Sequence, residues 1–252
     1  MGWRHGCGGL FEPFSIVTPM LTNLTPWTAV IPLRGGSKGL PGKNTRLLAG
    51  KPLYRHAVDL ALAAGASRVL ISTDIPEVLS ADLPPTVEAL QRPAELCGDT
   101  VPMAPVLVHA LQTAQVKGPV VLLQATSPLR QVADVQAALQ RLASGAFDLV
   151  MSVTDAERSV LKWGQVQPDG RFVPLSSPEH CFANRQSLPP VYKPNGAVYA
   201  LHAPWFIEQQ SFVSERIGTV VMPTERSFDI DNVEDFERCA ALLSSATQGT
   251  PS

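Results

Sequence analysis

A glycine-rich segment with three cationic side chains follows the first hydrophobic run of the chain. Residues 31–44 read IPLRGGSKGLPGKN, and the basic members are Arg34, Lys38 and Lys43. Glycine lets the main chain approach a ligand where a β-carbon would collide, so backbone N–H groups and cations can surround a polyphosphate together. We interpret the segment as a candidate phosphate-binding loop, with an ordinary strand-to-helix turn as the alternative.

The segment follows neither of the two common phosphate-binding patterns. A Walker loop ending at Gly42 and Lys43 requires glycine at position 37 and Ser or Thr at position 44, where the chain has Ser37 and Asn44. A dinucleotide fingerprint requires glycines at 35, 37 and 40, or at 36, 38 and 41, and neither set is present. Any phosphate binding here must therefore use a different arrangement.

Two carboxylates stand near the other end of the chain, in the sequence SFDID. Asp229 and Asp231 are two residues apart, so both side chains point to one side of an extended segment. Two hard oxygen donors suit Mg²⁺, which takes one or two protein carboxylates and completes its shell with water and substrate phosphate. A solvated turn with a helix cap is the alternative, but together with a basic loop the pair favours metal-assisted nucleotide chemistry.

Short hydrophobic runs alternate with helical patterns from residue 28 onward, which predicts a mostly parallel sheet with helices on its faces. Strands are expected at 29–33, 68–73, 87–90, 120–124, 149–153 and 218–222. Helices are expected at 53–64, 101–115, 132–142 and 233–243. Asp231 or Asn232 can cap the last helix. The predicted fold class is α/β.

Polar residues at the strand ends are informative, because ligands of open α/β sheets bind at the carboxyl ends of the strands. The basic loop follows the first predicted strand, Arg92 follows the third, and Gln124 ends the fourth. We expect these residues and the acidic pair to share one edge of the sheet. A plain surface position is the alternative for Arg92.

The alternating pattern stops between about residues 155 and 199. The sequence KWGQVQPDGRFVPL predicts a hairpin that turns at Pro168, Asp169 and Gly170, and a polar, proline-rich loop follows it. An insertion of this kind in a regular α/β domain usually serves as a lid, a binding element or an oligomer contact.

Composition excludes several classes of protein. The 252 residues are 45% hydrophobic with a formal net charge of -2, so nucleic-acid binding through bulk electrostatics is not expected. No apolar run reaches the ~18–20 residues of a membrane span. The four cysteines are far apart and lack histidine partners, which fits reduced thiols in a cytoplasmic protein. We expect a disordered extension over 1–27, without a signal peptide, and a tail over 246–252.

Five motifs together point to a family. They read IPLRGGSKGLPGKN, RPAEL followed by GDT, LLQATSPLR, NRQSLPPVYKPNGAVY and SFDIDNVEDFE. Over residues 29–243 the chain resembles the acylneuraminate cytidylyltransferases, which make CMP-activated sialic acids. The resemblance implies a single nucleotidyltransferase-type, Rossmann-like three-layer αβα domain over 28–245, with CTP as co-substrate and Mg²⁺ as cofactor. It also implies a homodimer, with residues 155–199 serving dimerisation and acceptor binding.

The resemblance also implies roles for single residues. The residues that match the family's CTP-binding positions are Arg34, Ser37, Lys38, Lys43, Asn44 and Arg92. The residues that match its acceptor-binding positions are Gln124, Lys162, Arg185, Asn195 and Tyr199. The metal ligands would be Asp229 and Asp231, and the catalytic residues would be Lys43, Arg34, Lys38 and Asp231. Lys162 and Arg185 would act partly across the dimer contact, with a simple salt bridge as the alternative for Lys162.

Three departures from the family pattern leave every charged position in place. Leu33 stands where alanine is frequent, Ala125 replaces a proline after Gln124, and Met103 replaces a serine of some relatives near the base.

We therefore expect the 2-hydroxyl of a nonulosonic acid, N-acetylneuraminate or legionaminate, to attack the α-phosphorus of CTP and release pyrophosphate. The nearest alternative is a 3-deoxy-manno-octulosonate cytidylyltransferase or another sugar nucleotidyltransferase. From a different class, the chain could be an inactive nucleotide- or sugar-binding relic, against which the retention of Lys43, Asp229 and Asp231 argues.

Overall fold

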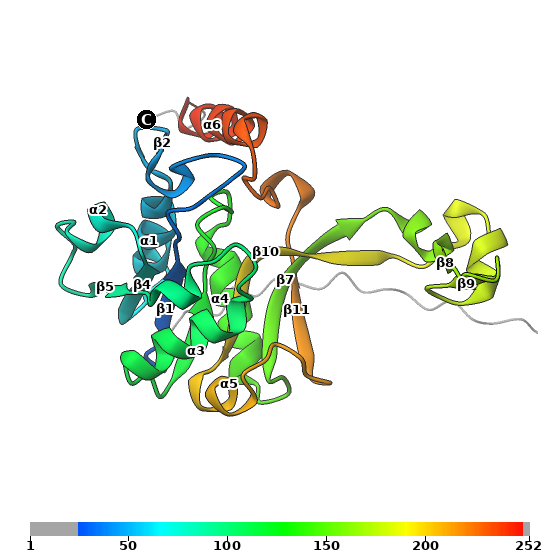
Figure 1. The fold of residues 1–252 in the computed structure, drawn as a ribbon, viewed down its shortest axis with the longest axis horizontal. Coiled ribbons are helices and arrows are strands. Elements are labelled where there is room, and N and C mark those ends of the chain that lie inside the picture. Colours follow the sequence, from blue (N-terminus) through cyan, green and yellow to red (C-terminus); the bar gives the residue numbers. More distant parts are fainter. Residues whose placement is uncertain (1–24, 249–252) are drawn as a thin grey trace, which may run out of the picture.

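The computed structural model describes residues 25–248, and the side chains as far as residue 244. The strands of its main sheet are β1 (Thr28–Pro32), β4 (Arg68–Thr73), β5 (Val87–Gln91), β6 (Pro119–Leu122), β7 (Leu149–Ala156), β10 (Val191–His202) and β11 (Ile217–Val221). They form a seven-stranded sheet in the order β11-β7-β10-β6-β1-β4-β5 (Figure 1). Only β10 is antiparallel to its neighbours within the described sheet. The predicted mostly parallel α/β fold is confirmed.

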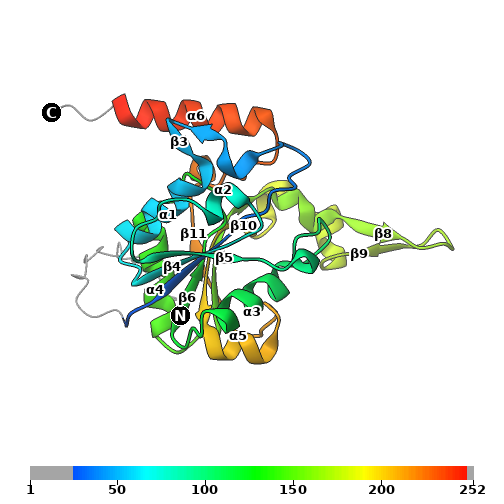
Figure 2. The ribbon, with the colours of Figure 1, turned by 60° about the vertical axis from the view of Figure 1, so that its left-hand side comes forward.

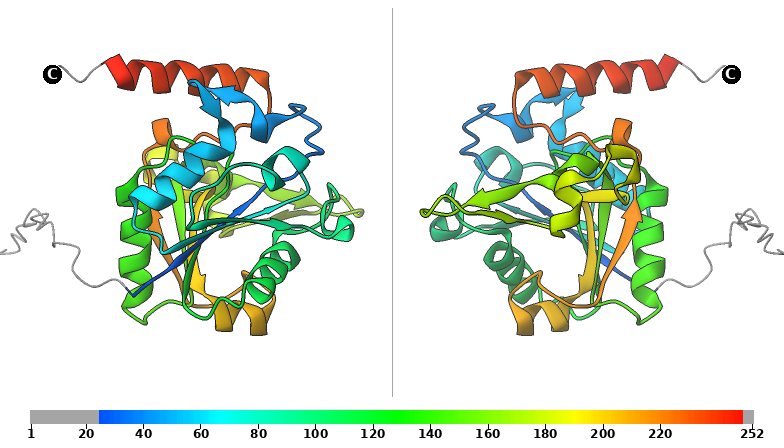
Figure 3. Two further views of the ribbon diagram at one scale, coloured as in Figure 1. Left: turned by 90° about the vertical axis from the view of Figure 1, so that its left-hand side faces the viewer. Right: turned by 90° about the vertical axis from the view of Figure 1, so that its right-hand side faces the viewer.

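Helices cover both faces of the sheet. They are α1 (Leu53–Ala63), α2 (Pro76–Leu79), α3 (Met103–Thr113), α4 (Val132–Ala143), α5 (Ala203–Gln209) and α6 (Val233–Gln248). The side chains of β1 alternate, so that Ala29 and Ile31 pack with α1 and α4, while Val30 packs with α3 and α5 on the other face. Figure 3 shows the resulting helix and sheet layers from two sides. Each predicted strand and helix is present within a few residues of its expected bounds.

Helix α6 packs above a third hydrophobic cluster, next to the short hairpin of β2 (Leu47–Leu48) and β3 (Lys51–Pro52) (Figure 2). The helix begins at Val233, and the side-chain Oδ1 of Asn232 accepts a 2.9 Å hydrogen bond from the backbone N–H of Asp235. Of the two predicted caps, Asn232 therefore provides the capping oxygen.

The strand that the sequence pattern did not reveal is β10. We expected a polar loop after the hairpin, whereas β10 lies between β6 and β7 in the middle of the sheet. Pro194 and Gly196 disfavour strand structure, and the pairing register with β7 shifts between Pro194 and Tyr199. Because of this bulge, the segment lacks the simple alternation by which strands are recognised.

The predicted hairpin is confirmed as β8 (Gly164–Val166) paired with β9 (Phe172–Pro174). With the single-turn helices around it, the hairpin forms a projection from the sheet between β7 and β10, which we call the arm (residues 157–190; Figure 1). None of the described helices has the length and apolar character needed to cross a membrane.

The predicted terminal segments lie largely outside the described residues, which leaves out 1–24 and 249–252. Trp27 is described, and its side chain is only 2% exposed in the hydrophobic core. Its carbonyl oxygen accepts hydrogen bonds from the N–H and the hydroxyl of Ser67. The folded part of the chain therefore includes Trp27, ahead of β1.

Candidate active site

Two adjoining pockets open at the carboxyl ends of the parallel strands. The residues that line the first pocket include Arg34, Ser37, Lys43, Asn44, Arg92 and Gln124. Those of the second include Gln124, Asn195, Gly196, Tyr199, Ser227 and Asp229. The structure thus gathers five of the six nucleotide candidates around one space and three of the five acceptor candidates around the next, with Gln124 common to both. Lys38 lines neither pocket, and its side chain is 83% exposed.

Two side chains shape the start of the basic loop. The amide Nδ2 of Asn44 donates to the carbonyl oxygen of Arg34 at 3.0 Å, and Oδ1 of Asp74 accepts from the N–H of Gly35 at 2.9 Å. Asp74 comes directly after β4, so a neighbouring strand end supports the loop. Sequence reasoning identified Asn44 but gave no role to Asp74.

The middle of the loop lies against the acidic segment. A β-carbon at Gly39 would overlap the carbonyl oxygen of Asp231, so only glycine permits this approach. Leu40 and Ile230 are both buried in the hydrophobic cluster beneath α6. The loop and the acidic pair are therefore held together by packing as well as by charge.

Lys43 connects the two halves electrostatically. Its side chain is 11% exposed, and its Nζ donates to the carbonyl oxygen of Ile230 and lies 3.4 Å from Oδ1 of Asp231. An ammonium group has three donors, so a third N–H is available for a ligand in the first pocket.

Asp99 is the shared partner of the other two loop cations. It forms ion pairs with Arg34 and, at 2.6 Å, with Nζ of Lys38. Hydrogen bonds from Lys38 and Arg34 hold the pKa of the Asp99 carboxyl below its usual value. The aspartate belongs to the GDT motif quoted above, to which sequence reasoning gave no chemical role.

Arg92 is buried in the wall of the first pocket. Its Nε and Nη2 donate to the hydroxyl and carbonyl oxygens of Ser72 at 3.2 and 2.7 Å. Burial lowers the pKa of the guanidinium, so these bonds offset part of the cost of desolvating its charge. The alternative of a plain surface residue does not describe this environment.

The two carboxylates of the acidic pair differ in environment. Asp229 keeps exposed surface at the rim of the second pocket, yet loss of solvation raises its pKa, opposed by a hydrogen bond from Thr126. The side chain of Asp231 is 76% exposed. No group of three or more His, Cys, Asp or Glu side chains that could hold a metal is found among the described residues. Two carboxylates could supply at most part of the shell of a cation, whose other ligands would be water and bound phosphate.

Tyr199 and Gly196 line the second pocket. Burial, and secondarily the charge of Asp229, raise the pKa of the Tyr199 hydroxyl. Gly196 has a φ of +75°, and a β-carbon there would lie 3.3 Å from Oε1 of Gln124. The backbone of β10 thus lies against the side chain of Gln124, which lines both pockets.

Two acceptor candidates lie elsewhere. Lys162 and Arg185 belong to the arm, and Arg185 pairs with Glu157 at 2.5 Å at the edge of a different depression. Within one copy of the chain, the structure does not bring either residue into the two adjoining pockets.

Residues 28–245 match the model of a protein family described as cytidylyltransferase. The chain belongs to this family. The predicted family membership is thereby confirmed, and the two pockets described above are the candidate active site of a cytidylyltransferase.

Two relatives illustrate the range of similar cytidylyltransferases. The chain is 30% identical over 210 residues to the N-acylneuraminate cytidylyltransferase of Streptococcus agalactiae serotype V, covering 82% of this chain and 51% of that protein. It is 32% identical over 229 residues to the CMP-N,N'-diacetyllegionaminic acid synthase of Legionella pneumophila, covering 85% of this chain and 95% of that protein. The chain spans about half the length of the streptococcal relative.

The fold is also found in a solved structure. The CMP:2-keto-3-deoxy-manno-octonic acid synthetase complexed with CTP superposes with a TM-score of 0.66 at 21% identity, covering 88% of this chain and all of that one. This likeness supports the fold of the cytidylyltransferase domain, a single αβα unit.

Proposed function

We propose that this cytidylyltransferase transfers the cytidylyl group of CTP to the 2-hydroxyl of a nonulosonic acid, N-acetylneuraminate or legionaminate, with release of pyrophosphate. The observation that carries the proposal is the pair of adjoining pockets that share Gln124. A nucleotide beside the basic loop and an acid sugar beside Tyr199 would meet at this residue. Transfer requires such a placement of two substrates in one reactive geometry.

Cationic side chains of the chain itself would supply most of the electrostatic stabilisation. Arg34, Lys38 and Lys43 would bind the phosphates and stabilise charge on the departing pyrophosphate. The glycine-rich backbone of the loop would allow the triphosphate to lie close to the main chain. Arg92, anchored on Ser72, would present its remaining donors to the first pocket.

Asp229 and Asp231 would hold Mg²⁺. When bound, the ion would neutralise phosphate charge and polarise the α-phosphorus. Loss of solvation, and secondarily the charge of Asp231, raise the pKa of Asp229, and a bound divalent cation would favour its charged form. Lys43, already beside Asp231, would keep that carboxylate oriented.

We propose that a second copy of the chain covers the arm and makes a homodimer. The arm carries large apolar side chains that are exposed to solvent, among them Phe182, which is 92% exposed, and Trp163, which is 60% exposed. Arginine binds carboxylates through a bidentate fork, so Arg185, with Lys162, would reach the acid group of the sugar in the partner's pocket. Sedimentation of the Phe182→Glu variant would test the contact, with a monomer as the expected result.

The reaction is tested by pyrophosphate release. CTP, UTP and GTP are each combined with Mg²⁺ and with N-acetylneuraminate, legionaminate, pseudaminate or 3-deoxy-manno-octulosonate. Release with CTP and one of the first two acids is the expected result. Activity confined to the octulosonate would establish the nearest alternative, and no release with any combination would leave a ligand-binding protein.

A further inference from the structure

The bulge in β10 is held by side chains from β10 itself and from two other segments. Between Pro194 and Tyr199 the strand leaves its register with β7, so the backbone groups of residues 195–198 lose regular ladder partners. Buried N–H and C=O groups need substitutes, because leaving one unpaired costs about 1–3 kcal/mol. In this bulge the substitutes are polar side chains.

Ser152, Asn195 and Arg130 supply the missing partners. The hydroxyl of Ser152, on β7, accepts from the N–H of Val198 at 2.8 Å. Oδ1 of Asn195 accepts from the N–H of Ala197 at 3.2 Å, and Nη1 of Arg130 donates to the carbonyl oxygen of Ala197 at 2.8 Å. All three side chains are buried.

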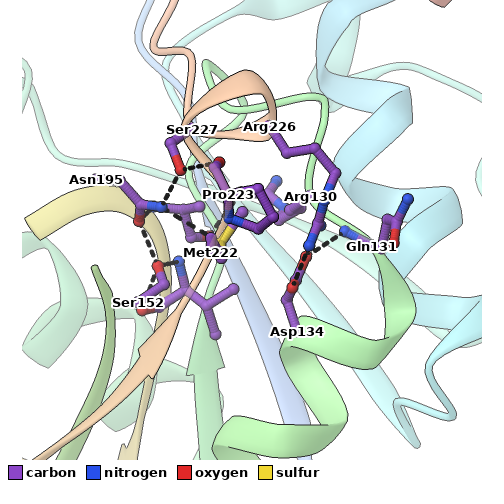
Figure 4. A network of polar contacts seen from close by, with 11 residues as sticks. Arg130, Gln131, Asp134, Ser152, Asn195, Met222, Pro223, Arg226 and Ser227 are labelled. Carbon is purple, nitrogen blue, oxygen red and sulfur yellow. Dashed lines mark hydrogen bonds and ion pairs between the residues drawn. The ribbon is translucent and has the colours of Figure 1, made fainter. Parts of the chain in front are cut away.

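The amide of Asn195 is fully engaged in this network (Figure 4). Its Oδ1 accepts from the Ser152 hydroxyl at 2.5 Å as well as from Ala197. Its Nδ2 donates to Oγ of Ser227 at 2.9 Å and to Sδ of Met222 at 3.3 Å. A primary amide has two acceptor and two donor positions, and here all four are used. A sugar hydroxyl could bind this side chain only by displacing one of these bonds.

Ser227 extends the network to the acidic pair. It accepts from Asn195 and donates to the carbonyl oxygen of Pro223 at 2.8 Å, which fixes the turn leading to Asp229. Farther along, Arg226 forms a two-pronged ion pair with Asp134 at the start of α4 (Figure 4). The bulge of β10 is therefore bonded through Asn195 and Ser227 to the turn that precedes Asp229.

We infer that Ser152, Asn195 and Ser227 are positioning residues, which hold the β10 bulge so that Gly196 and Tyr199 face the acceptor, rather than residues that bind it. The role assigned to Asn195 by resemblance becomes indirect. The kinetic test of this inference rests on the proposed function, because it requires turnover of the acid sugar. The inference also predicts a structural readout that needs no substrate.

The kinetic test uses alanine variants along the network. Ser152→Ala and Ser227→Ala should each raise the KM for the acid sugar by about tenfold, while the KM for CTP stays within about twofold, because the first pocket lies outside the network. Asn195→Ala should give a similar split. Ser67→Ala is the matched control, since it also removes a serine-to-carbonyl bond, but at the amino end of β4.

Two kinetic results would overturn the inference. If Asn195→Ala raises the sugar KM and Ser152→Ala does not, Asn195 binds the acceptor itself. If the KM for CTP rises equally, or Ser67→Ala has the same effect, the serines only stabilise the fold. Should Ser152→Ala fail to fold, Ser227→Ala, whose side chain lies closer to the surface, provides the same comparison.

Amide hydrogen exchange tests the bulge directly. In Ser152→Ala the N–H of Val198 loses its acceptor, so residues 195–199 should exchange at least tenfold faster, with residues 34–44 unchanged. Equal protection in parent and variant would refute the inference. Because this measurement needs neither CTP nor sugar, it still decides the matter if the parent enzyme uses no nonulosonic acid.

Discussion

Lys43 and Asp231 stand 3.4 Å apart, from Nζ to Oδ1, although 188 positions separate them in the chain. The same ammonium group donates to the carbonyl oxygen of Ile230. The basic loop and the acidic pair therefore form one charged unit. A lysine in this position can stabilise phosphate charge without a large rearrangement.

Lys43→Met tests that role. The substitution keeps most of the aliphatic stem but removes the charge, so kcat should fall on the order of 10²–10³-fold, as for the loss of one preorganised donor. The melting temperature should change by a few degrees at most. Lys51→Met is the control, since Lys51 makes a surface ion pair with Asp59 outside both pockets. Near-normal turnover of the Lys43 variant would refute the assignment.

Gly39→Ala tests the close approach of the loop to the acidic segment. The added methyl group would overlap the backbone carbonyl of Asp231, so the loop must shift and the KM for CTP should rise at least tenfold. Gly36→Ala is a control for folding, because a β-carbon there would meet no other atom within 4 Å. Thermal melts should show destabilisation in the first variant only. Equal melts and unchanged CTP binding in Gly39→Ala would contradict this packing.

Asp99→Asn tests competition between the carboxylate and CTP for the same cations. Asp99 pairs with Arg34 and Lys38, so a triphosphate must displace it or bind against its charge. Removal of the charge should tighten CTP binding about two- to tenfold, in keeping with the modest strength of exposed ion pairs. Calorimetric titration at two salt concentrations measures this effect. Weaker binding would mean that Asp99 orders the cations for the ligand.

Metal dependence tests whether Asp229 and Asp231 bind Mg²⁺ or serve only in a turn and a helix cap. Chelation with EDTA should abolish pyrophosphate release, and added Mg²⁺ should restore it. Asp229→Asn and Asp231→Asn should each raise the Mg²⁺ concentration for half-maximal activity by about tenfold or more, because each removes one hard ligand. Glu234→Gln, in the first turn of α6, is the control. Unchanged metal response in both aspartate variants would exclude the pair as ligands.

Arg226→Met tests the buried end of the polar network. The substitution leaves the Asp134 carboxylate, 7% exposed, without its cation. The expected loss is about 2–4 kcal/mol of unfolding free energy, measured by urea denaturation. Lys51→Met breaks an exposed pair and should cost less than about 1 kcal/mol. Similar losses in the two variants would show that burial does not strengthen the Arg226 pair.

The sequence allowed much of this fold to be predicted because the parallel strands are short, apolar and separated by amphipathic helices. Strand β4 was expected at 68–73 and occupies those residues. Strand β10 was missed, since Pro194 and Gly196 break its pattern and its stability comes from neighbours distant in sequence. Local patterns do not report such long-range support.

The residues of the candidate site also divide into those that could be predicted from local sequence and those that could not. Gln124, Arg92 and the basic loop could be expected together, because the ends of parallel strands share one edge. The roles of Asp99 and Ser152 could not be predicted, since they depend on contacts formed only after folding. Lys162 and Arg185 lie on the arm, so a single chain gives them no place in either pocket.

Strand β10 leaves the arm at Val191 and then runs through the middle of the sheet, carrying the bulge on the way. A contact made on the arm therefore acts on the same continuous backbone that carries Gly196 and Tyr199. In the proposed reaction, substitutions in the arm would change which acid sugar is selected while every pocket side chain stays the same. Substrate choice would then evolve at the periphery of the molecule, through the placement of one strand.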